Sequence, residues 1–255
     1  MHIAVCLKQV MRRGSHLRVD DARPWVREGD ASWELNEPDA YALEEALRLR
    51  ERHGGDVTAV SAGPPRVIHV LREALARGAD RAVHVDGPHL ALADGPTVAS
   101  ALAAGIGAIE GGPPDLVLTG LQSDDQGWGQ VGVMLAERLD ATHATIVMEV
   151  QIDAGRLRVK RELEGGWFQW VAMPLPAVLT IQSGINHLRY ATLKGIMAAK
   201  KKEIRVVAAS APETPRLRIL SLAVPARARQ VQMIEGTASE AARELVRRLR
   251  EQRAI

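Results

Sequence analysis

The segment GLQSDDQGWGQVG, residues 120–132, carries residue types that suit the binding of a phosphorylated ligand. Directly before a predicted helix, a GxGxxG pattern is formed by Gly127, Gly129 and Gly132. Free backbone N–H groups and the positive end of a helix dipole attract phosphate. Hydrogen-bonding groups for a ribose or an adenine are supplied by Ser123, Asp125 and Gln126. This glycine-rich segment therefore predicts a nucleotide site, and the alternative is a polar connection at the surface.

The glycine-rich segment lacks the context of a dinucleotide-binding turn. In dinucleotide-binding folds the first glycine follows the strand at once, whereas LQSDDQ separates the predicted strand from Gly127 here. A lysine in the arrangement of a P-loop is missing as well. We therefore expect neither nicotinamide-dependent hydride transfer nor nucleotide hydrolysis.

Metal binding and covalent catalysis have little support in the sequence. Asp124 and Asp125 are adjacent, so their side chains diverge, and no third ligand for Mg²⁺ is evident. His143 and His187 are single and lack the spacing of a metal site. Cys6 lies inside a predicted strand, where we expect an inert apolar residue. We expect no catalytic residue, no metal and no independent enzymatic activity.

Predicted strands and helices alternate along residues 1–150. Short apolar runs predict strands at 3–10, 56–63, 81–86, 115–120 and 142–150, and the amphipathic runs between them predict helices. Asn36 is the expected N-cap of the first helix, which ends at Gly54, and Asp94 is the expected N-cap of another. The fold class is therefore α/β, a mostly parallel, Rossmann-like sheet with helices on both faces.

Ligands of such sheets bind at the carboxyl ends of the strands. In this chain the rule selects the loops after Lys8, after Ala62 and after Gly120. The last of these loops is the glycine-rich segment, so topology and residue chemistry indicate the same edge of the sheet.

The rest of the chain departs from this alternation. LRVKREL, Gly165-Gly166 and FQWVAM predict an antiparallel hairpin, and PAVLTIQS returns to the buried sheet. After Val207, prolines and arginines without periodicity predict an extended arm, and a terminal helix begins near Thr237 or Ser239. We expect an α/β domain at 1–206 and an arm with a helix at 207–255. The arm and helix embrace a partner or pack back on the domain.

Composition and charge limit the class of protein. The 255 residues have a net charge of only +2 and scattered arginines, so nucleic acid is not an expected partner. No apolar run approaches the roughly 20 residues of a membrane span. The N-terminus enters a strand pattern without a signal peptide, and a single cysteine suits a reducing compartment. We expect a soluble, cytoplasmic protein.

A second unusual segment, GINHLRYATLKGIMAAKKK, follows the last buried strand at 184–202. It places Leu193 between Arg189 and a run of lysines, ahead of a short helix pattern. Taken alone, one exposed leucine needs no functional explanation.

Several of these segments together resemble the beta subunit of electron-transfer flavoprotein. The most specific is VKRELEGGWFQWVAMPLPAVLT at 159–180, which is similar to the family signature throughout. Further matches follow in the family's order: LNEPDAYALEEALRLRE at 35–51, VSAGP at 60–64, ALARGADRAVHV at 74–85, GLQSDDQ at 120–126 and RYATLKGIMAAKKK at 189–202. The resemblance extends from the first strand to about Arg205, and weakly into the tail.

The resemblance implies a subunit of a heterodimeric electron carrier. In this family a larger alpha subunit holds most of the FAD, and the beta subunit is an adenine-nucleotide-hydrolase-like domain that holds AMP for structure. The loop with Met11 and Arg13 is implied to lie beside the FAD, and the C-terminal arm beside the alpha subunit. The implied AMP contacts are Cys6, Asn36, Glu37, Pro38, Asp39, Ala62, Gln122, Ser123, Asp125, Gln126, Gly127, Gly129, Gln130, Val131 and Gly132.

The identity of the nucleotide is open within the family. AMP-type members have Ser or Thr near position 131, whereas Gln130-Val131-Gly132 looks more like the electron-bifurcating type, in which a second FAD replaces AMP. Bifurcating members carry an acid where this chain has Gly127 and a small residue where it has Trp128. The Trp128 indole narrows the site, so we expect AMP. From other classes, the alternatives are a nucleotide-sensing α/β domain that acts alone and an interaction module with an empty pocket.

The resemblance also assigns a role to residues 184–202. In the family, a leucine at the tip of a recognition loop, about 184–200 here, enters a pocket on flavoprotein dehydrogenases, and Leu193 matches that leucine. One apolar contact gives a weak, quickly reversible hot spot, and basic residues at its rim steer an acidic partner. The family usually has proline where this chain has Leu188. The residues implied in partner recognition are Arg189, Tyr190, Leu193, Lys200 and Lys201.

Overall fold

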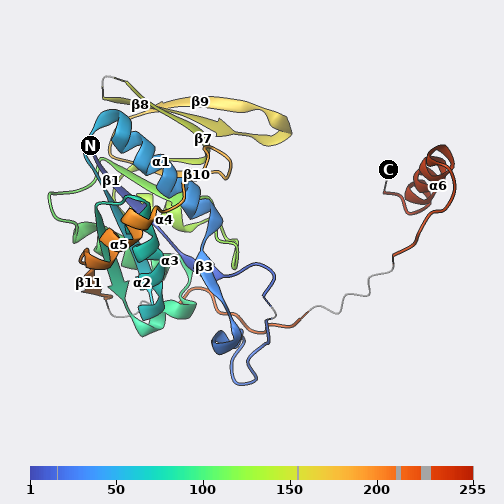
Figure 1. Ribbon diagram of the computed structural model, residues 1–255, viewed down its shortest axis with the longest axis horizontal. Coiled ribbons are helices and arrows are strands. Elements are labelled where there is room, and N and C mark those ends of the chain that lie inside the picture. Colours follow the sequence, from blue (N-terminus) through green and yellow to red (C-terminus); the bar gives the residue numbers. More distant parts are fainter. Residues whose placement is uncertain (16, 154, 211–213, 225–230, 255) are drawn as a thin grey trace. The chain divides into compact units, whose positions relative to one another are not determined.

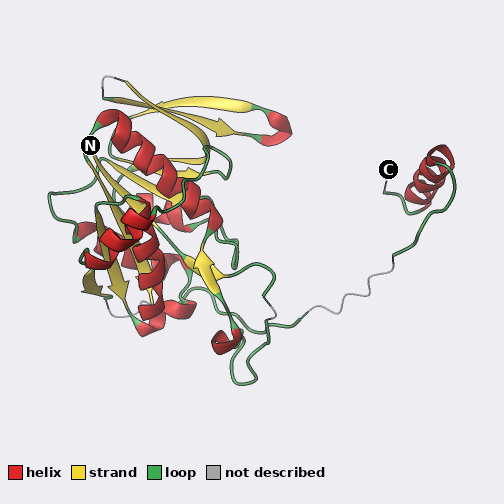
Figure 2. Cartoon of the chain, in the orientation of Figure 1, coloured by secondary structure: helices red, strands yellow, loops and turns green. Residues whose placement is uncertain are grey.

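The structure is a computed structural model that describes residues 1–255 except 16, 154, 211–213, 225–230 and 255. It divides into two compact units, Met1–Leu220 and Ser221–Ile255. Figures 1 and 2 show the first unit as a sheet with packed helices and the second as a helix with its leading segment. Residues 211–213 and 225–230 of the expected arm, and the final Ile255, lie outside the described residues.

A large mixed sheet forms the centre of the first unit. Its strands are β1 (His2–Cys6), β4 (Asp56–Gly63), β5 (Arg81–Asp86), β6 (Leu116–Gly120), β7 (Thr142–Asp153), β8 (Arg156–Glu162), β9 (Phe168–Met173), β10 (Ala177–Ile181) and β11 (Arg205–Ala208). Their order across the nine-stranded sheet is β11-β5-β4-β1-β6-β10-β7-β8-β9. The pairs from β11 to β7 are parallel, and β7, β8 and β9 pair antiparallel. The expected α/β fold with a mostly parallel sheet is confirmed.

Helices cover both faces of this sheet. The helices of the first unit are α1 (Glu37–His53), α2 (Ile68–Arg77), α3 (Gly95–Gly107), α4 (Val131–Arg138) and α5 (Leu193–Lys201). Short 3-10 turns occur at η1 (Glu28–Asp30), η2 (Pro65–Val67), η3 (Pro88–Leu92) and η4 (Glu164–Gly166). Side chains alternate across a strand. In β1, Ile3 and Val5 accordingly pack with α1 and α2, and Ala4 and Cys6 pack with α3 and α4.

The structure corrects the single strand expected at 3–10. β1 ends at Cys6, and a separate strand β2 (Gln9–Met11) pairs antiparallel with β3 (Trp33–Leu35). The sheet ladder stops because the Lys8 backbone N–H donates to the Asp39 carboxylate at 2.7 Å instead of to a neighbouring strand. β11 is a further strand that the sequence pattern did not indicate, and it extends the sheet beside β5.

The predicted antiparallel hairpin is present as β8 and β9, joined through η4. β7 is longer than expected, because its first half pairs with β10 and its second half pairs with β8. The three antiparallel strands extend from the body of the first unit (Figure 1).

In the second unit, α6 spans Ala238–Glu251. Thr237 and Glu240 form a capping box, in which each side chain accepts the other's backbone N–H. The helix start expected near Thr237 is therefore confirmed.

Candidate functional site

A cavity with a volume of about 140 Å³ lies at the carboxyl ends of β1, β4 and β6. We call it the strand-end cavity. Among the positions implied as nucleotide contacts, Glu37, Pro38 and Gly127 do not line it. Those that line it are Cys6, Asn36, Asp39, Ala62, Gln122, Ser123, Asp125, Gln126, Gly129, Gln130, Val131 and Gly132. Most of the implied residues therefore meet at the edge of the sheet that the topology selected.

The start of α1 joins the loops around this cavity. Asn36 was expected to cap the helix, but its side chain makes no cap hydrogen bond. Its amide instead donates to the Gln122 carbonyl at 3.0 Å and accepts the Asp124 N–H at 2.9 Å. The side chain of Asn36 therefore holds the glycine-rich segment against α1, because that segment supplies both a donor and an acceptor within its reach.

Asp39, which is buried, makes the second connection between these loops. One carboxylate oxygen accepts the Lys8 N–H at 2.7 Å and the other accepts the Gly120 N–H at 2.9 Å. Burial raises the pKa of Asp39 to about 7, although both N–H groups favour its ionised form. A Cβ on Gly120 would lie 2.4 Å from an Asp39 oxygen, so only glycine allows α1 to approach the end of β6 this closely.

Lys8 is a cavity residue that the sequence reasoning did not assign. Its ammonium contacts Ser123 Oγ at 3.2 Å, Asp125 Oδ1 at 2.7 Å and Gln126 Oε1 at 2.9 Å. Burial opposes ionisation of Asp125, but Lys8 and further hydrogen bonds bring its pKa below the ordinary value. The available signal was a basic residue directly after a buried strand, in one of the loops that the topology rule selected.

The cavity lining also carries aromatic residues. Trp128 of the glycine-rich segment was expected there, whereas Trp25, Trp33 and Arg66 were not indicated by a sequence motif. The Arg66 guanidinium stacks 3.5 Å from the Trp33 ring centroid and donates to Gln9 Oε1 at 3.0 Å. Burial lowers the pKa of Arg66, and Glu28 opposes that shift. These residues add a cation and aromatic faces to the cavity.

The cavity combines charged, polar and apolar surface. Positive charge comes from Lys8 and Arg66, negative charge comes from Asp39 and Asp125, and backbone N–H groups come from the turn before α4. Apolar surface comes from Leu90, Val98 and Leu102. Cys6 also lines the cavity, and burial, followed by the charge of Asp39, raises the pKa of its thiol well above the ordinary range. A buried thiol of this kind is no nucleophile.

The two residues implied beside a flavin lie outside this cavity. Met11 ends β2, and the Arg13 guanidinium is 2.8 Å from Asp124 and 2.7 Å from Glu37. The hydrogen bond and the charge of Asp124, and then Glu37, raise the pKa of Arg13. Arg13 thus contacts the outer side of the glycine-rich segment, whose inner side faces the cavity.

The described residues contain neither a candidate metal centre nor a candidate membrane span. Among them, no cluster of three His, Cys, Asp or Glu residues has the geometry of a metal site. No helix within the same part of the chain has the length and hydropathy needed to span a membrane.

Comparison with known proteins identifies the family. The sequence-family model for the electron transfer flavoprotein domain matches residues 25–212 of this chain. The chain belongs to the electron transfer flavoprotein family. The electron transfer flavoprotein subunit beta of Methylophilus methylotrophus is 36% identical to this chain over 264 residues, which cover 98% of both proteins. The subunit beta of Thermoanaerobacterium thermosaccharolyticum is 36% identical over the full length of both, and that of Sus scrofa is 35% identical over 97% of this chain and 96% of its own.

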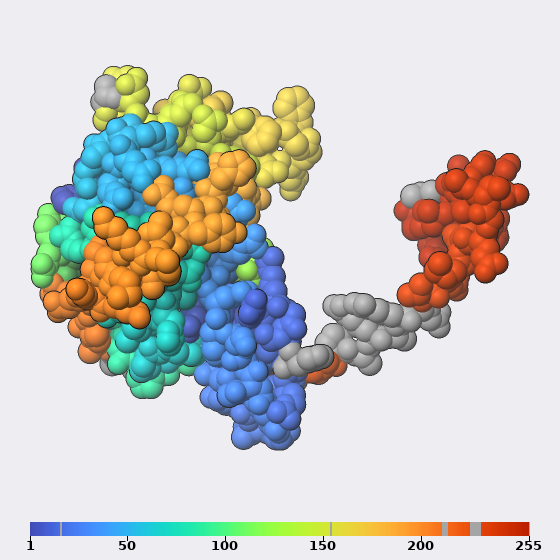
Figure 3. Space-filling model, viewed as in Figure 1, coloured from blue at the N-terminus to red at the C-terminus, as the bar shows by residue number. Residues whose placement is uncertain are grey.

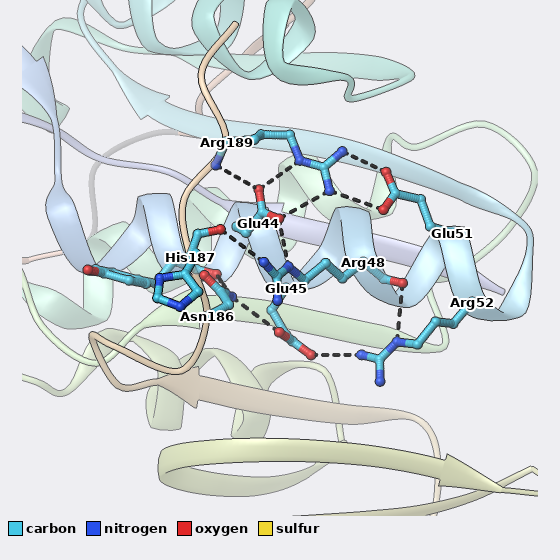
Figure 4. Close-up of polar contacts among 9 residues, drawn as sticks. Glu44, Glu45, Arg48, Glu51, Arg52, Asn186, His187 and Arg189 are labelled. Carbon is cyan, nitrogen blue, oxygen red and sulfur yellow. Dashed lines mark hydrogen bonds and ion pairs between the residues drawn. The ribbon is translucent and has the colours of Figure 1, made fainter.

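In this electron transfer flavoprotein chain, residues 184–202 lie on the surface beside α1 and α2, as Figure 3 shows in orange. We call them the docking segment, after the role that the sequence resemblance implies for them. Tyr190 is 92% exposed and Leu193 is 84% exposed, and Met197 of α5 is exposed next to them in sequence. Lys200 and Lys201 are exposed in the last turn of α5. Arg189 differs from these residues, because its guanidinium lies against α1 (Figure 4).

Proposed function

We propose that this chain is the beta subunit of a heterodimeric electron transfer flavoprotein, and that it holds AMP in the strand-end cavity. It accepts electrons from flavoprotein dehydrogenases and passes them on through an FAD that the alpha subunit mainly holds. The observation that carries the proposal is the cavity itself, in which Lys8, Asn36 and Asp39 join three strand-end loops around a polar and partly apolar space. Family membership supports the electron-carrier role.

The residues present fit an adenine nucleotide without a metal. Leu90, Val98 and Leu102 offer apolar surface for the base, and Lys8 and the N–H groups before α4 offer donors for a phosphate. In this proposal AMP has a structural role, because it bridges loops that also meet through the polar contacts of Lys8, Asn36 and Asp39. The chain itself positions the flavin-bearing subunit, and the FAD supplies the redox chemistry.

A second FAD in place of AMP is the alternative within the family. Val131 at the start of α4 has no hydroxyl that could bind a phosphate of AMP, and this favours the second FAD. Trp128 lines the cavity beside Gly129 and Gln130 and takes up space that an isoalloxazine ring needs. We therefore propose AMP and treat the second FAD as the competing outcome.

Two surfaces of the chain serve as partner sites in this proposal. The segment after Leu220 exposes Leu222, Val224, Val231 and Met233, which suits burial against the alpha subunit. Leu193 and Tyr190 of the docking segment form the contact with a dehydrogenase. A small exposed apolar surface gives a short-lived complex, as a carrier requires.

The decisive experiment measures the cofactors of the assembled protein. The chain is co-expressed with its alpha subunit, the complex is purified and denatured, and the released nucleotides are quantified by chromatography. We expect equal amounts of FAD and AMP per heterodimer. A matched Val98→Trp variant, which would enlarge a partly buried residue of the cavity lining, should lose AMP while the wild-type complex retains it.

The other outcomes are distinct. Two FAD per heterodimer without AMP would assign the chain to the bifurcating type and reject the proposed role of Trp128. Absence of a complex with any alpha subunit, or of any flavin in the complex, would contradict the proposed function.

A further inference from the structure

Arg189 makes the densest set of polar contacts in the docking segment (Figure 4). Its Nε donates to Glu44 at 2.8 Å, its Nη1 donates to Glu51 at 2.6 Å, and its Nη2 donates to both carboxylates at 3.1 Å. Its backbone N–H also donates to Glu44 at 3.2 Å. Both acids lie on α1, where Glu44 is buried and Glu51 is exposed. The guanidinium is therefore held by two carboxylates in a fixed orientation.

Neighbouring residues attach the same stretch of chain to α1. The Asn186 amide donates to the Tyr41 carbonyl and to Glu45, both at 3.1 Å. Arg48 donates to the His187 carbonyl at 3.0 Å. The docking segment therefore follows α1 from residue 186 to residue 189.

The far end of the docking segment is attached to α2. Arg72 donates to the carbonyls of Ala199 and Lys202, and the Lys202 ammonium donates to the Ala79 carbonyl at 2.7 Å. A Cβ on Gly195 would lie 2.3 Å from the Ala76 carbonyl oxygen, so α5 packs directly on the α2 backbone. The exposed residues Tyr190 and Leu193 lie between the two attachments.

We propose that Arg189 is a positioning residue: by joining the docking segment to Glu44 and Glu51 it presents Tyr190 and Leu193 to a flavoprotein dehydrogenase in a single, ordered arrangement. This inference depends on the proposed docking function. A surface that is already ordered loses less conformational entropy when a partner binds it. Arg189 therefore acts through the shape of the surface and not as a steering charge, because two carboxylates already neutralise it.

The test compares five heterodimers loaded with FAD: wild type, Arg189→Lys, Leu193→Ala, the double variant of these two, and a control variant. Lysine keeps the positive charge but cannot make the paired contacts of the guanidinium. Arg205→Lys is the matched control, because Arg205 is an exposed arginine of β11 with a single ion pair to Glu110. The electron donor is a purified flavoprotein dehydrogenase of the source organism, supplied with its own substrate. The reduction rate is measured against heterodimer concentration, and hydrogen exchange is measured at residues 186–192.

We expect Arg189→Lys to raise KM about tenfold with kcat little changed, a factor that corresponds to about 1.4 kcal/mol. Exchange at 186–192 should become faster, whereas Arg205→Lys should match wild type in both measurements. The double variant should raise KM by less than the product of the two single effects, because a looser segment costs less once one of the two contacts that it presents is gone. Unchanged FAD and nucleotide contents in Arg189→Lys will show that the fold is intact.

Other results overturn the inference. A KM that Arg189→Lys leaves unchanged would mean that charge alone matters at this position. Effects that multiply in the double variant would mean that Arg189 acts independently of Leu193. A wild-type heterodimer that the dehydrogenase does not reduce would contradict the docking function instead, and unchanged exchange in Arg189→Lys would then reject the positioning role as well.

Discussion

Lys8 shows how one side chain stabilises the strand-end cavity. Its ammonium is the cation beside Asp125, a carboxylate whose side chain is only 9% exposed. A buried carboxylate needs a cation or several hydrogen-bond donors, because burial in a low dielectric otherwise favours its neutral form. Lys8 thus fixes the glycine-rich segment through charge, whereas Asn36 fixes it through backbone contacts.

Replacing this ammonium should destabilise the chain. We expect Lys8→Met to lower the free energy of unfolding by about 1–2 kcal/mol, less than for a fully buried pair because Lys8 is partly exposed. Urea unfolding followed by circular dichroism measures the difference. Lys194→Met, which changes an exposed lysine on α5, is the control and should stay within about 0.5 kcal/mol of wild type. Equal effects of the two substitutions would show that the Lys8 contacts do not contribute to stability.

The cavity residues also show what a sequence can reveal at this scale. Ser123, Gln126 and Gly129 stood out because their types suit nucleotides and they cluster in one segment. Trp25 and Trp33 did not, because they belong to a stretch without periodicity whose path depends on tertiary contacts. Asn36 was read as a helix cap because local rules favour it there, but a partner far along the chain, Gln122, takes its side chain.

Among the elements, α3 carries an N-cap with two functions. One oxygen of the buried Asp94 accepts the N–H and hydroxyl of Thr97, and the other accepts the N–H groups of Arg216 and Leu217. Burial works against ionisation, but these donors together bring the pKa of Asp94 below its ordinary value. The start of α3 thereby fixes the point at which the last part of the first unit passes the cavity wall.

The two functions of Asp94 can be separated by substitution. Asparagine retains one oxygen, which can still cap α3, but its amide nitrogen cannot accept the N–H groups of Arg216 and Leu217. We expect Asp94→Asn to speed hydrogen exchange at residues 216 and 217 about tenfold while the amide of Thr97 stays protected. Asp94→Ala should make hydrogen exchange faster at all three amides, those of Thr97, Arg216 and Leu217. Unchanged exchange at 216 and 217 in Asp94→Asn would contradict this reading.

Helix α1 connects the cavity to the docking segment, and its acids make that connection sensitive to acid. The hydrogen bonds of Arg189 lower the pKa of Glu51. Burial opposes ionisation of Glu44, but Arg189 and Arg48 together bring its pKa below the ordinary value. The other charged or titratable groups near Glu44 and Glu51 are Glu45, Arg48, Arg50 and Arg52 of α1 and His187 of the docking segment. A carboxyl group whose folded-state pKa is depressed stabilises the fold above its unfolded-state value and loses that contribution as pH falls through the folded-state value.

We therefore expect the contribution of Arg189 to the free energy of unfolding to depend on pH. The difference in unfolding free energy between wild type and Arg189→Met should be constant from about pH 7 down to about pH 5. It should shrink as pH falls below 4.5, the ordinary value of a glutamate. Denaturant titrations of both proteins across this range measure it. A difference that stays constant down to about pH 3 would show that these carboxylates do not interact with Arg189.

For the whole molecule, the division after Leu220 has a direct consequence for assembly. The first unit contains the complete sheet and both hydrophobic cores, so it has what an independent fold requires. We expect a chain that stops at Leu220 to keep its thermal midpoint within a few degrees of the full-length value, as calorimetry will show. Size-exclusion chromatography should show that it no longer forms a stable complex with the alpha subunit. A truncated chain that still assembles would place the alpha-subunit contact entirely on the first unit.

The architecture was predictable from the sequence to a large extent. Runs of buried residues in β4, β5 and β6 alternate with amphipathic helices, and α1 and α2 end at glycines, so local and global preferences agree. The ends of elements were less predictable, because long-range contacts decide them. β1 stops where Asp39 takes the Lys8 N–H, and β11 forms only because the edge of β5 is available.

The properties of Cys6 make the protein suitable for site-specific labelling at an introduced cysteine. It is the single cysteine of the chain, it is buried, and its thiol has a strongly raised pKa, so thiol reagents at neutral pH should leave it unmodified. A cysteine introduced by Tyr190→Cys would then be the one reactive position of this subunit. A nitroxide or fluorophore placed there can report, in the assembled carrier and without further substitutions in this chain, when the docking surface meets a partner and how long that encounter lasts.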